Sequence, residues 1–298
     1  MLRTFSILCA GLAALSFLTG SAVAQQEAPA KPAAKGKVEV ATTFRSGDLI
    51  GMKVKNRAGE NLGQIEDLVV ELKSGDIRYA ALSFGGFAGF GDKLFAVPWQ
   101  AMTFKFGEND RFFVFDVTQK ELEAAPGFDR DRWPDVGNPE WSEGIDKHYS
   151  SKRTAAVDQA PRPAPSNELK EADASPADAI FRVSTIDGMN VRNDAGKDIG
   201  HVEELVLDIK SGKVKYAALS FGGFVGFGDK LFAIPMRAFT LKHGADETFF
   251  VLDISQDRLE KAPGFDKNNW PDTADPQWSA EIDKYYPERT AQRPTTRK

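Results

Sequence analysis

A glycine-rich phrase that ends in a lysine occurs twice in the chain and is the first candidate for chemistry. It reads SFGGFAGFGDKLFAVPW over residues 83–99 and SFGGFVGFGDKLFAIPM over residues 220–236. Such a loop binds phosphate when it joins a strand to a helix, because backbone amides then converge on the anion. Here Asp92 precedes Lys93 and a strand-like segment follows. The phrase therefore does not fit a nucleotide site.

Two other interpretations of the phrase are open. Glycines that take positive φ would let the loop fold tightly, with its phenylalanines tucked back to close the end of a barrel. Alternatively, the phenylalanines project and bind a protein partner. We favour closure, with Asp92 and Asp229 fixing the loop geometry rather than binding an ion. The loop and interaction candidates are Gly85, Gly86, Phe87, Phe90, Asp92, Lys93, Gly222, Gly223, Phe224, Phe227, Asp229 and Lys230.

One acidic run has the spacing of a metal site, because calcium favours alternating oxygen ligands. The glycine and the terminal glutamate of an EF-hand loop are missing, and two arginines interrupt the run. Turn formation and helix capping explain its residues, so we predict no metal and no cofactor and keep calcium as an alternative. The run is Asp129, Asp131 and Asp135, and its echo is Asp266, Asn268 and Asp272.

The chain is a tandem duplication. A shift of 137 residues aligns Gly51 with Gly188 and continues without a gap, and about 57 of the 102 positions in 48–149 are identical in the second copy. The period is far longer than the 20–50 residues of stacked repeats, so the unit is a domain. Two similar sites on one chain would raise avidity for a partner with two matching surfaces.

No catalytic set is repeated in the two copies. His148, His201 and His243 each align with a different residue in the other copy, and the mature chain expected below has no cysteine nucleophile. The paired carboxylates Glu66–Asp67 and Glu203–Glu204 do recur. Neighbours on a strand point to opposite faces and cannot converge as acid and base. We interpret them as a solvated barrel face and predict no enzymatic activity.

Short strands with tight turns must position these residues. Branched aliphatic and aromatic runs separated by turn residues predict five or six strands in about 75 residues of each copy, as in a small antiparallel barrel or curled sheet. Pro98 and Pro235 should mark strand ends. In the first copy the expected strands cover residues 51–56, 61–72, 77–84, 93–98, 102–106 and 111–117.

Short helices follow each predicted barrel. Thr118 and Glu121 form a capping-box pattern, and Asn138 precedes a proline and an acidic first turn. In the second helix Trp141, Ile145 and Tyr149 recur every four residues, and we expect this stripe to pack on its own domain.

The composition is that of a soluble globular protein. Hydrophobic residues make up 42% and charged residues 27% of the 298 residues, and the formal net charge is −5. An acidic chain lacks the broad basic surface that displaces counterions from nucleic acid, so we predict no nucleic-acid partner.

The first residues have the pattern of an export signal. Arg3 precedes an apolar run, and Ala22-Val23-Ala24 has the small-residue spacing that signal peptidase prefers. The first mature residue would be Gln25, and Cys9, the only cysteine, would be removed with the signal. We therefore expect a periplasmic or secreted protein.

Stretches rich in alanine and proline divide the chain, because such segments cannot bury enough apolar surface to fold. Without a shared cysteine and with a polar linker, each repeat is expected to fold alone, and contact between the repeats is left open. The predicted layout is signal peptide 1–24, flexible leader 25–42, first repeat 43–150, flexible linker 151–179, second repeat 180–287 and flexible tail 288–298.

Residues 51–99, with LGQIEDLVVELKSGDIRYAALSFGGFAGFGDKLFAVPW, resemble the PRC-barrel domain, a family named for the cytoplasmic barrel of the photosynthetic reaction-centre H subunit. Residues 188–236 repeat the resemblance, with Met236 where the first copy has Trp99. The resemblance implies a small β-barrel used as an adaptor or assembly module, with no catalytic residues to carry over.

We therefore predict a mainly β protein made of two small antiparallel PRC-like barrels, each followed by short helices and joined by a flexible linker. Its expected function is that of an exported, non-enzymatic adaptor or scaffold for a protein or membrane-associated complex in the cell envelope. A small-ligand or calcium-binding envelope protein is the alternative. The sequence does not indicate an oligomeric state.

Overall fold

The computed structural model describes residues 42–84, 93–150, 180–221, 230–254, 258–259 and 261–286. The chain is mainly β, as predicted, and each repeat forms the body of an 8-stranded sheet. The predicted signal peptide, leader, linker and tail lie outside the described residues, apart from Thr42 at the end of the leader.

The first repeat follows the predicted strand order closely. Pro98 ends its fourth predicted strand, as expected, because proline cannot donate to the next rung of a ladder. The elements are β1 (Thr43–Arg45), α1 (Ser46–Leu49), β2 (Lys53–Lys55), β3 (Asn61–Glu71), β4 (Ile77–Ser83), β5 (Lys93–Pro98), η1 (Trp99–Ala101), β6 (Met102–Phe106), β7 (Arg111–Phe115), α2 (Gln119–Glu123), β8 (Gly127–Asp129) and α3 (Pro139–His148).

The second repeat has the same elements in the same order wherever it is described. They are β9 (Ile180–Arg182), α4 (Val183–Ile186), β10 (Asn190–Arg192), β11 (Asp198–Asp208), β12 (Lys213–Ser220), β13 (Lys230–Pro235), η4 (Met236–Ala238), β14 (Phe239–His243), β15 (Thr248–Leu252), β16 (Gly264–Asp266) and α6 (Pro276–Tyr285).

The sheets differ from the prediction in one pairing per repeat. The strand order is β6-β7-β2-β3-β4-β5-β8 in one sheet and β14-β15-β10-β11-β12-β13-β16 in the other. Neighbours along these paths are antiparallel except that β2 runs parallel to β7, and β10 parallel to β15. The sheets are therefore mixed rather than purely antiparallel. The chain crosses back over the sheet after β5, so that the β6–β7 hairpin arrives beside β2 with β7 in the same direction.

The predicted helices form and pack on their own repeat. Thr118 and Glu121 make both bonds of the capping box of α2, and the Asn138 side chain accepts from the Glu140 amide at the start of α3. On α3, Ile145 and Tyr149 are each 2% exposed, which confirms the predicted apolar stripe. None of the helices in the described part of the chain is long and apolar enough to span a membrane.

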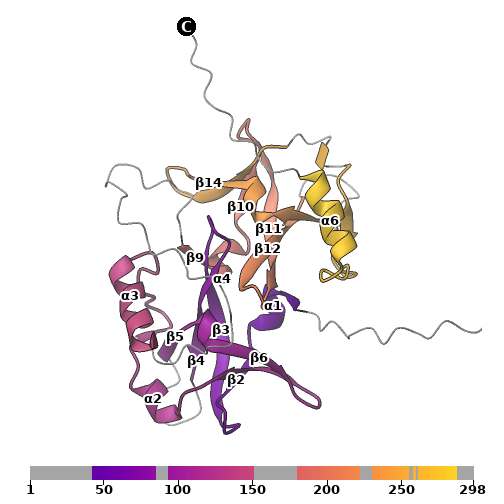
Figure 1. Cartoon of the computed structure of the whole chain (residues 1–298). Coiled ribbons are helices and arrows are strands. Elements are labelled where there is room, and N and C mark those ends of the chain that lie inside the picture. Colours follow the sequence, from indigo (N-terminus) through magenta and orange to yellow (C-terminus); the bar gives the residue numbers. More distant parts are fainter. Residues whose placement is uncertain are drawn as a thin grey trace, which may run out of the picture. The chain divides into compact units, whose positions relative to one another are not determined.

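The two repeats exchange their first strands. β1 pairs with β11 of the second repeat, and β9 pairs with β3 of the first. Figure 1 shows β9 and α4 beside β3, and α1 beside β11. β2 covers only the first part of the long β3 edge, and β9 adds to the same edge from Val69 to Glu71. The exchanged strand thus pairs backbone groups that would otherwise form an open sheet edge.

The tips of two equivalent hairpins also bond to each other. The Ile77 amide donates to the Gly212 carbonyl, and the Val214 amide donates to the Gly75 carbonyl, both at 2.8 Å. Lys213 adds an ion pair with Asp76, with Nζ and Oδ1 2.7 Å apart. These bonds repeat the reciprocity of the strand exchange.

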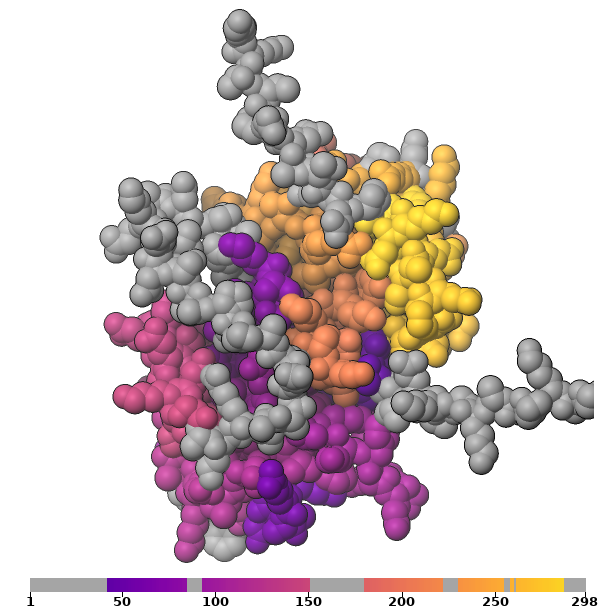
Figure 2. Space-filling model, in the orientation of Figure 1, coloured from indigo at the N-terminus to yellow at the C-terminus, as the bar shows by residue number. Residues whose placement is uncertain are grey.

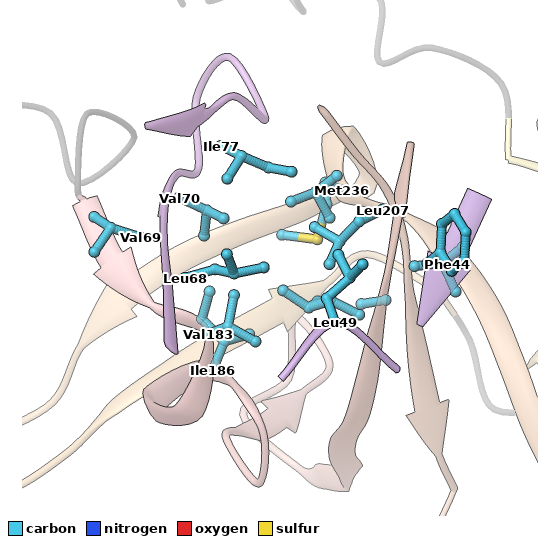
Figure 3. Packing of buried hydrophobic residues seen from close by; sticks show 14 of the residues in the cluster. Phe44, Leu49, Leu68, Val69, Val70, Ile77, Val183, Ile186, Leu207 and Met236 are labelled. Carbon is cyan, nitrogen blue, oxygen red and sulfur yellow. The ribbon is translucent and has the colours of Figure 1, made fainter. Parts of the chain in front are cut away.

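One hydrophobic core runs through both repeats. Figure 3 shows Leu68, Val70 and Ile77 of the first repeat pointing toward Leu207 and Met236 of the second. In β3 the four residues 67–70 are all buried, whereas a strand covered on one face alternates between buried and exposed residues. The second repeat therefore covers a face of β3 that the sequence interpretation had left to solvent.

We call the contact between the repeats the joint; it comprises β1, α1, β9, α4, the centres of β3 and β11 and the two hairpin tips. In Figure 2 the indigo surface of α1 lies against the orange and yellow of the second repeat. The joint removes the basis of the expectation that each repeat folds alone. A shared core and two exchanged strands now connect the repeats, although no cysteine or metal does.

Candidate interaction surface

Most residues of the predicted glycine-loop site lie outside the described residues, so the choice between loop closure and a binding knob stays a prediction. Lys93 and Lys230 are described, and both are exposed at the first positions of β5 and β13. Each lies opposite an aspartate in the sheet register, Lys93 beside Asp129 and Lys230 beside Asp266. The loop residues outside the description are Gly85, Gly86, Phe87, Phe90, Asp92, Gly222, Gly223, Phe224, Phe227 and Asp229.

The acidic run that resembled a calcium loop is engaged in local structure. Asp129 forms an ion pair with Arg132, and Asp135 Oδ1 accepts from the Gly137 amide at 3.0 Å. In the second repeat, Asp266 Oδ1 accepts from the Asn268 amide at 2.7 Å. These carboxylates act as turn formers, as the sequence suggested. Across the described residues, no group of three or more His, Cys, Asp or Glu side chains is placed to hold a metal.

The paired carboxylates of β3 and β11 lie at a register shift in the sheet, where the alternation of faces is interrupted, and one member of each pair enters the joint. Glu66 forms an ion pair with Arg130, and Glu203 forms one with Lys267. Asp67, by contrast, is 3% exposed, and Glu204 is half-buried. The interpretation of all four as a solvated face is therefore wrong for Asp67 and Glu204, because the other repeat covers their side of the strand.

Asp67 and Glu204 cap the first helix of the opposite repeat. The Ser184 amide donates to Asp67 Oδ1 at 3.2 Å, and the Ser184 hydroxyl donates to Oδ2. In the reciprocal contact, the Gly47 amide donates to Glu204 Oε1 at 2.8 Å. Both amides belong to the first turn of a helix, where backbone donors lack partners within the helix. Each repeat thus completes the helix of the other.

Asp187, which follows α4, adds a further carboxylate to this part of the joint. Its Oδ1 atom is buried and has no hydrogen-bond partner among the described residues. Burial, together with the carboxylates of Glu204, Asp67 and Glu203, raises the pKa of Asp187 from 3.8 to about 7. Loss of solvation and like charge act in the same direction, since both disfavour the ionised form.

A hollow on the first repeat is the best candidate for binding. It lies between residues 48–53, which lead into β2, and residues 106–111 at the β6–β7 hairpin, and its volume is about 640 Å³. Ile50, 38% exposed, and Phe106, 53% exposed, both line it, and they are the only large hydrophobic side chains that are exposed in the described part of the chain. We call this surface the Ile50–Phe106 hollow.

Three of the charged side chains that line the hollow contact neighbouring residues. Asp48 accepts two bonds from Arg45, and Asp110 pairs with Lys55 at 3.0 Å. The Arg111 guanidinium lies 5.3 Å from the centre of the Phe44 ring. Phe106 packs edge-on against Phe104, with ring centroids 4.9 Å apart. The hollow therefore places an apolar floor, formed by the side chains of Ile50 and Phe106, among polar and charged residues.

The second repeat lacks the apolar floor. At the positions equivalent to Ile50 and Phe106 it has Asp187 and His243. Because the same sheet forms around polar residues there, the fold does not require hydrophobic ones. The sequence contains a signal for this difference, because alignment of the two copies pairs Phe106 with His243.

The PRC-barrel domain family model matches the chain twice, over residues 41–120 and 178–258. Each match covers the exchanged strand, the short helix and the strands through β7 or β15, and ends within the first residues of the helical segment that follows. No curated protein sequence matches the chain.

Proposed function

Because the chain belongs to the PRC-barrel family, we propose that it is a non-enzymatic adaptor or scaffold that binds a protein or membrane-associated complex in the cell envelope. The observation that carries this proposal is the Ile50–Phe106 hollow, where two exposed hydrophobic side chains meet in one concave surface. An exposed apolar patch rimmed by polar residues is typical of an interaction site.

The duplication supports binding at one surface rather than at two. Ile50 and Phe106 have no apolar counterparts in the second repeat, so the avidity expected from two similar sites does not extend to this surface. We infer that the second repeat serves mainly to complete the first through the joint, and that the first repeat carries the binding surface.

Exchanging residues between the copies tests the proposal. We expect Ile50→Asp combined with Phe106→His to abolish capture of the partner from envelope extract by the immobilised full chain. The same change should lower the free energy of unfolding by about 1–2 kcal/mol and leave the chain folded, because both side chains are only partly buried. Urea unfolding and quantitative capture measure the two effects.

The matched control is Glu143→Ala, which introduces the second copy's residue at an exposed position of α3, away from the hollow. This variant should capture as the unchanged chain does. Equal capture by the double variant, with its fold intact, would refute the hollow as the binding surface.

The envelope location rests on the predicted export signal. We expect exported protein to begin at Gln25, because Ala22 and Ala24 occupy the positions that signal peptidase reads. N-terminal sequencing of the protein purified from envelope fractions measures this. Protein that retains Met1 in those fractions would contradict both cleavage and the envelope location.

A small apolar ligand is the second candidate for the same hollow. Its volume of about 640 Å³ lies within the range of small-molecule sites, roughly 300–1,000 Å³. Native mass spectrometry of the protein purified from its own cells would distinguish the two, since a retained small molecule that Phe106→His removes favours the ligand.

A further inference from the structure

The joint contains a carboxylate that takes no part in the two reciprocal helix caps. Asp67 and Glu204 each accept from the first turn of the opposite helix, so their charges are compensated by donors. Asp187 has no such role, and its Oδ1 atom is buried without a hydrogen-bond partner among the described residues. Its counterpart in the first repeat is the uncharged Ile50. Only one side of the joint therefore carries this additional group.

The backbone fixes Asp187 in this position. Its amide donates to the Val183 carbonyl at 2.9 Å, which closes the turn of α4. The next amide, that of Gly188, donates to the Val202 carbonyl on β11 at 2.7 Å. Gly188 has a φ of 84°, a conformation that other residues rarely adopt, so the chain turns sharply here. The backbone at Asp187 therefore cannot move far from β11 without breaking these bonds.

Carboxylates on two neighbouring strands act on the Asp187 carboxyl. β3 contributes Asp67, and β11 contributes Glu203 and Glu204. Glu203 pairs with Lys267 and lies 3.4 Å from His201. On the first repeat, the Arg45 guanidinium of β1 lies 3.8 Å from the Glu204 carboxylate. It also forms an ion pair with Asp48 of α1.

We propose that the joint is a proton-sensitive contact, in which α4 packs against β3 and β11 more tightly when the Asp187 carboxyl is neutral than when it is charged. A neutral carboxyl adds no like charge to Asp67 and Glu204 and costs less to bury. A charged one is repelled by both and keeps an unsatisfied oxygen inside the joint. Raising the pH thus loosens the contact between the repeats, and lowering it tightens the contact.

The direction of the pH effect follows from the raised pKa of Asp187, about 7 against an ordinary 3.8. Because the folded pKa is the higher one, the stabilisation is fully present below the ordinary value and is lost as pH rises through about 7. Burial also raises the pKa of Glu204, whereas the bond from Lys267 lowers that of Glu203. Comparing the Tm of the unchanged chain with that of Asp187→Asn at each pH separates the contribution of Asp187 from those of Glu203 and Glu204.

Thermal unfolding of the full chain from pH 5 to pH 8 tests the proposal. We expect Asp187→Asn to raise Tm by roughly 2–4 °C at pH 8 and by much less at pH 5. The matched control, Asp246→Asn, replaces an exposed aspartate by the first copy's residue. Its Tm should have the same pH dependence as that of the unchanged chain. Hydrogen exchange of residues 180–188 should slow in Asp187→Asn at pH 8, which locates the effect in the joint.

His201 is the imidazole beside Glu203, 3.4 Å away, and His201→Gln introduces the first copy's residue. We expect the pH dependence to persist in this variant. If the pH dependence of Tm were lost in His201→Gln but remained in Asp187→Asn, the proposal would be overturned. Should Asp187→Asn fail to fold, carbon-detected NMR titration of the unchanged chain decides, and an Asp187 carboxyl midpoint below about 5 would refute a proton-sensitive joint.

Discussion

Expressed alone, residues 43–150 should fail to give a monomeric domain with a cooperative thermal transition. Without the second repeat, β1 loses its partner β11, and the β3 edge from Val69 to Glu71 loses β9. Apolar side chains of the joint such as Leu68 and Val70, both 0% exposed, would face water. Exposing only five such side chains at about 1.5–3 kcal/mol each would remove roughly 7–15 kcal/mol, comparable to the whole stability of an ordinary domain.

The decisive comparison uses the two halves together. Residues 43–150 and 180–287 should each be unfolded or self-associated when separate, and should form a folded 1:1 complex when mixed, as followed by far-ultraviolet circular dichroism and light scattering. The full chain cleaved only within 151–179 is the control and should stay folded. A monomeric single repeat that unfolds at the Tm of the full chain would show that the joint contributes little.

The substitution Gly63→Ala should destabilise the full chain by more than about 3 kcal/mol, since backbone strain and overpacking each cost roughly 1–3 kcal/mol and act together here. Gly63 has a φ of 114°, and a Cβ built on it would lie 2.0 Å from the Ser83 carbonyl oxygen. That oxygen belongs to β4, so it cannot move without breaking the β3–β4 ladder. Urea unfolding measures the loss.

Gly59→Ala separates the cost of backbone strain at positive φ from the cost of a clash between a Cβ and a neighbouring strand. Gly59 has a φ of 83°, but nothing lies within 4 Å of a Cβ built there, so its cost should be only the strain of about 1–2 kcal/mol. Gly200 repeats the geometry of Gly63, with the Ser220 carbonyl oxygen at 2.0 Å, and Gly200→Ala should match the larger effect. A Gly63→Ala variant as stable as Gly59→Ala would contradict the close approach of β3 and β4.

Local signals in the sequence were sufficient for the elements of each repeat. The aliphatic run from Leu68 to Val70 predicted β3, and Thr118 with Glu121 predicted the cap of α2, because strand propensity and helix capping depend on neighbours in the chain. The three-residue strands β1 and β9 carry no such signal. They are strands only because the other repeat supplies their partners, which periodicity within one repeat does not reveal.

The candidate site was predicted least well for the same reason. The sequence placed Asp67 and Glu204 on strands, but whether a carboxylate there meets water or protein depends on the joint. The hollow required Ile50 and Phe106, 56 positions apart, to meet at one end of the parallel β2–β7 pair. In the purely antiparallel sheet that the sequence predicts, those positions would be separated.

The reciprocal exchange of β1 and β9 also determines how this fold responds to dilution. Two separate single-repeat chains joined in this way would be a dimer, whose folded fraction falls as the protein is diluted. In the duplicated chain the same contacts form within one molecule, at an effective concentration that the linker sets and that reaches the millimolar range for short flexible linkers. Its stability therefore does not depend on how much of the protein is present, which would suit the proposed scaffold role.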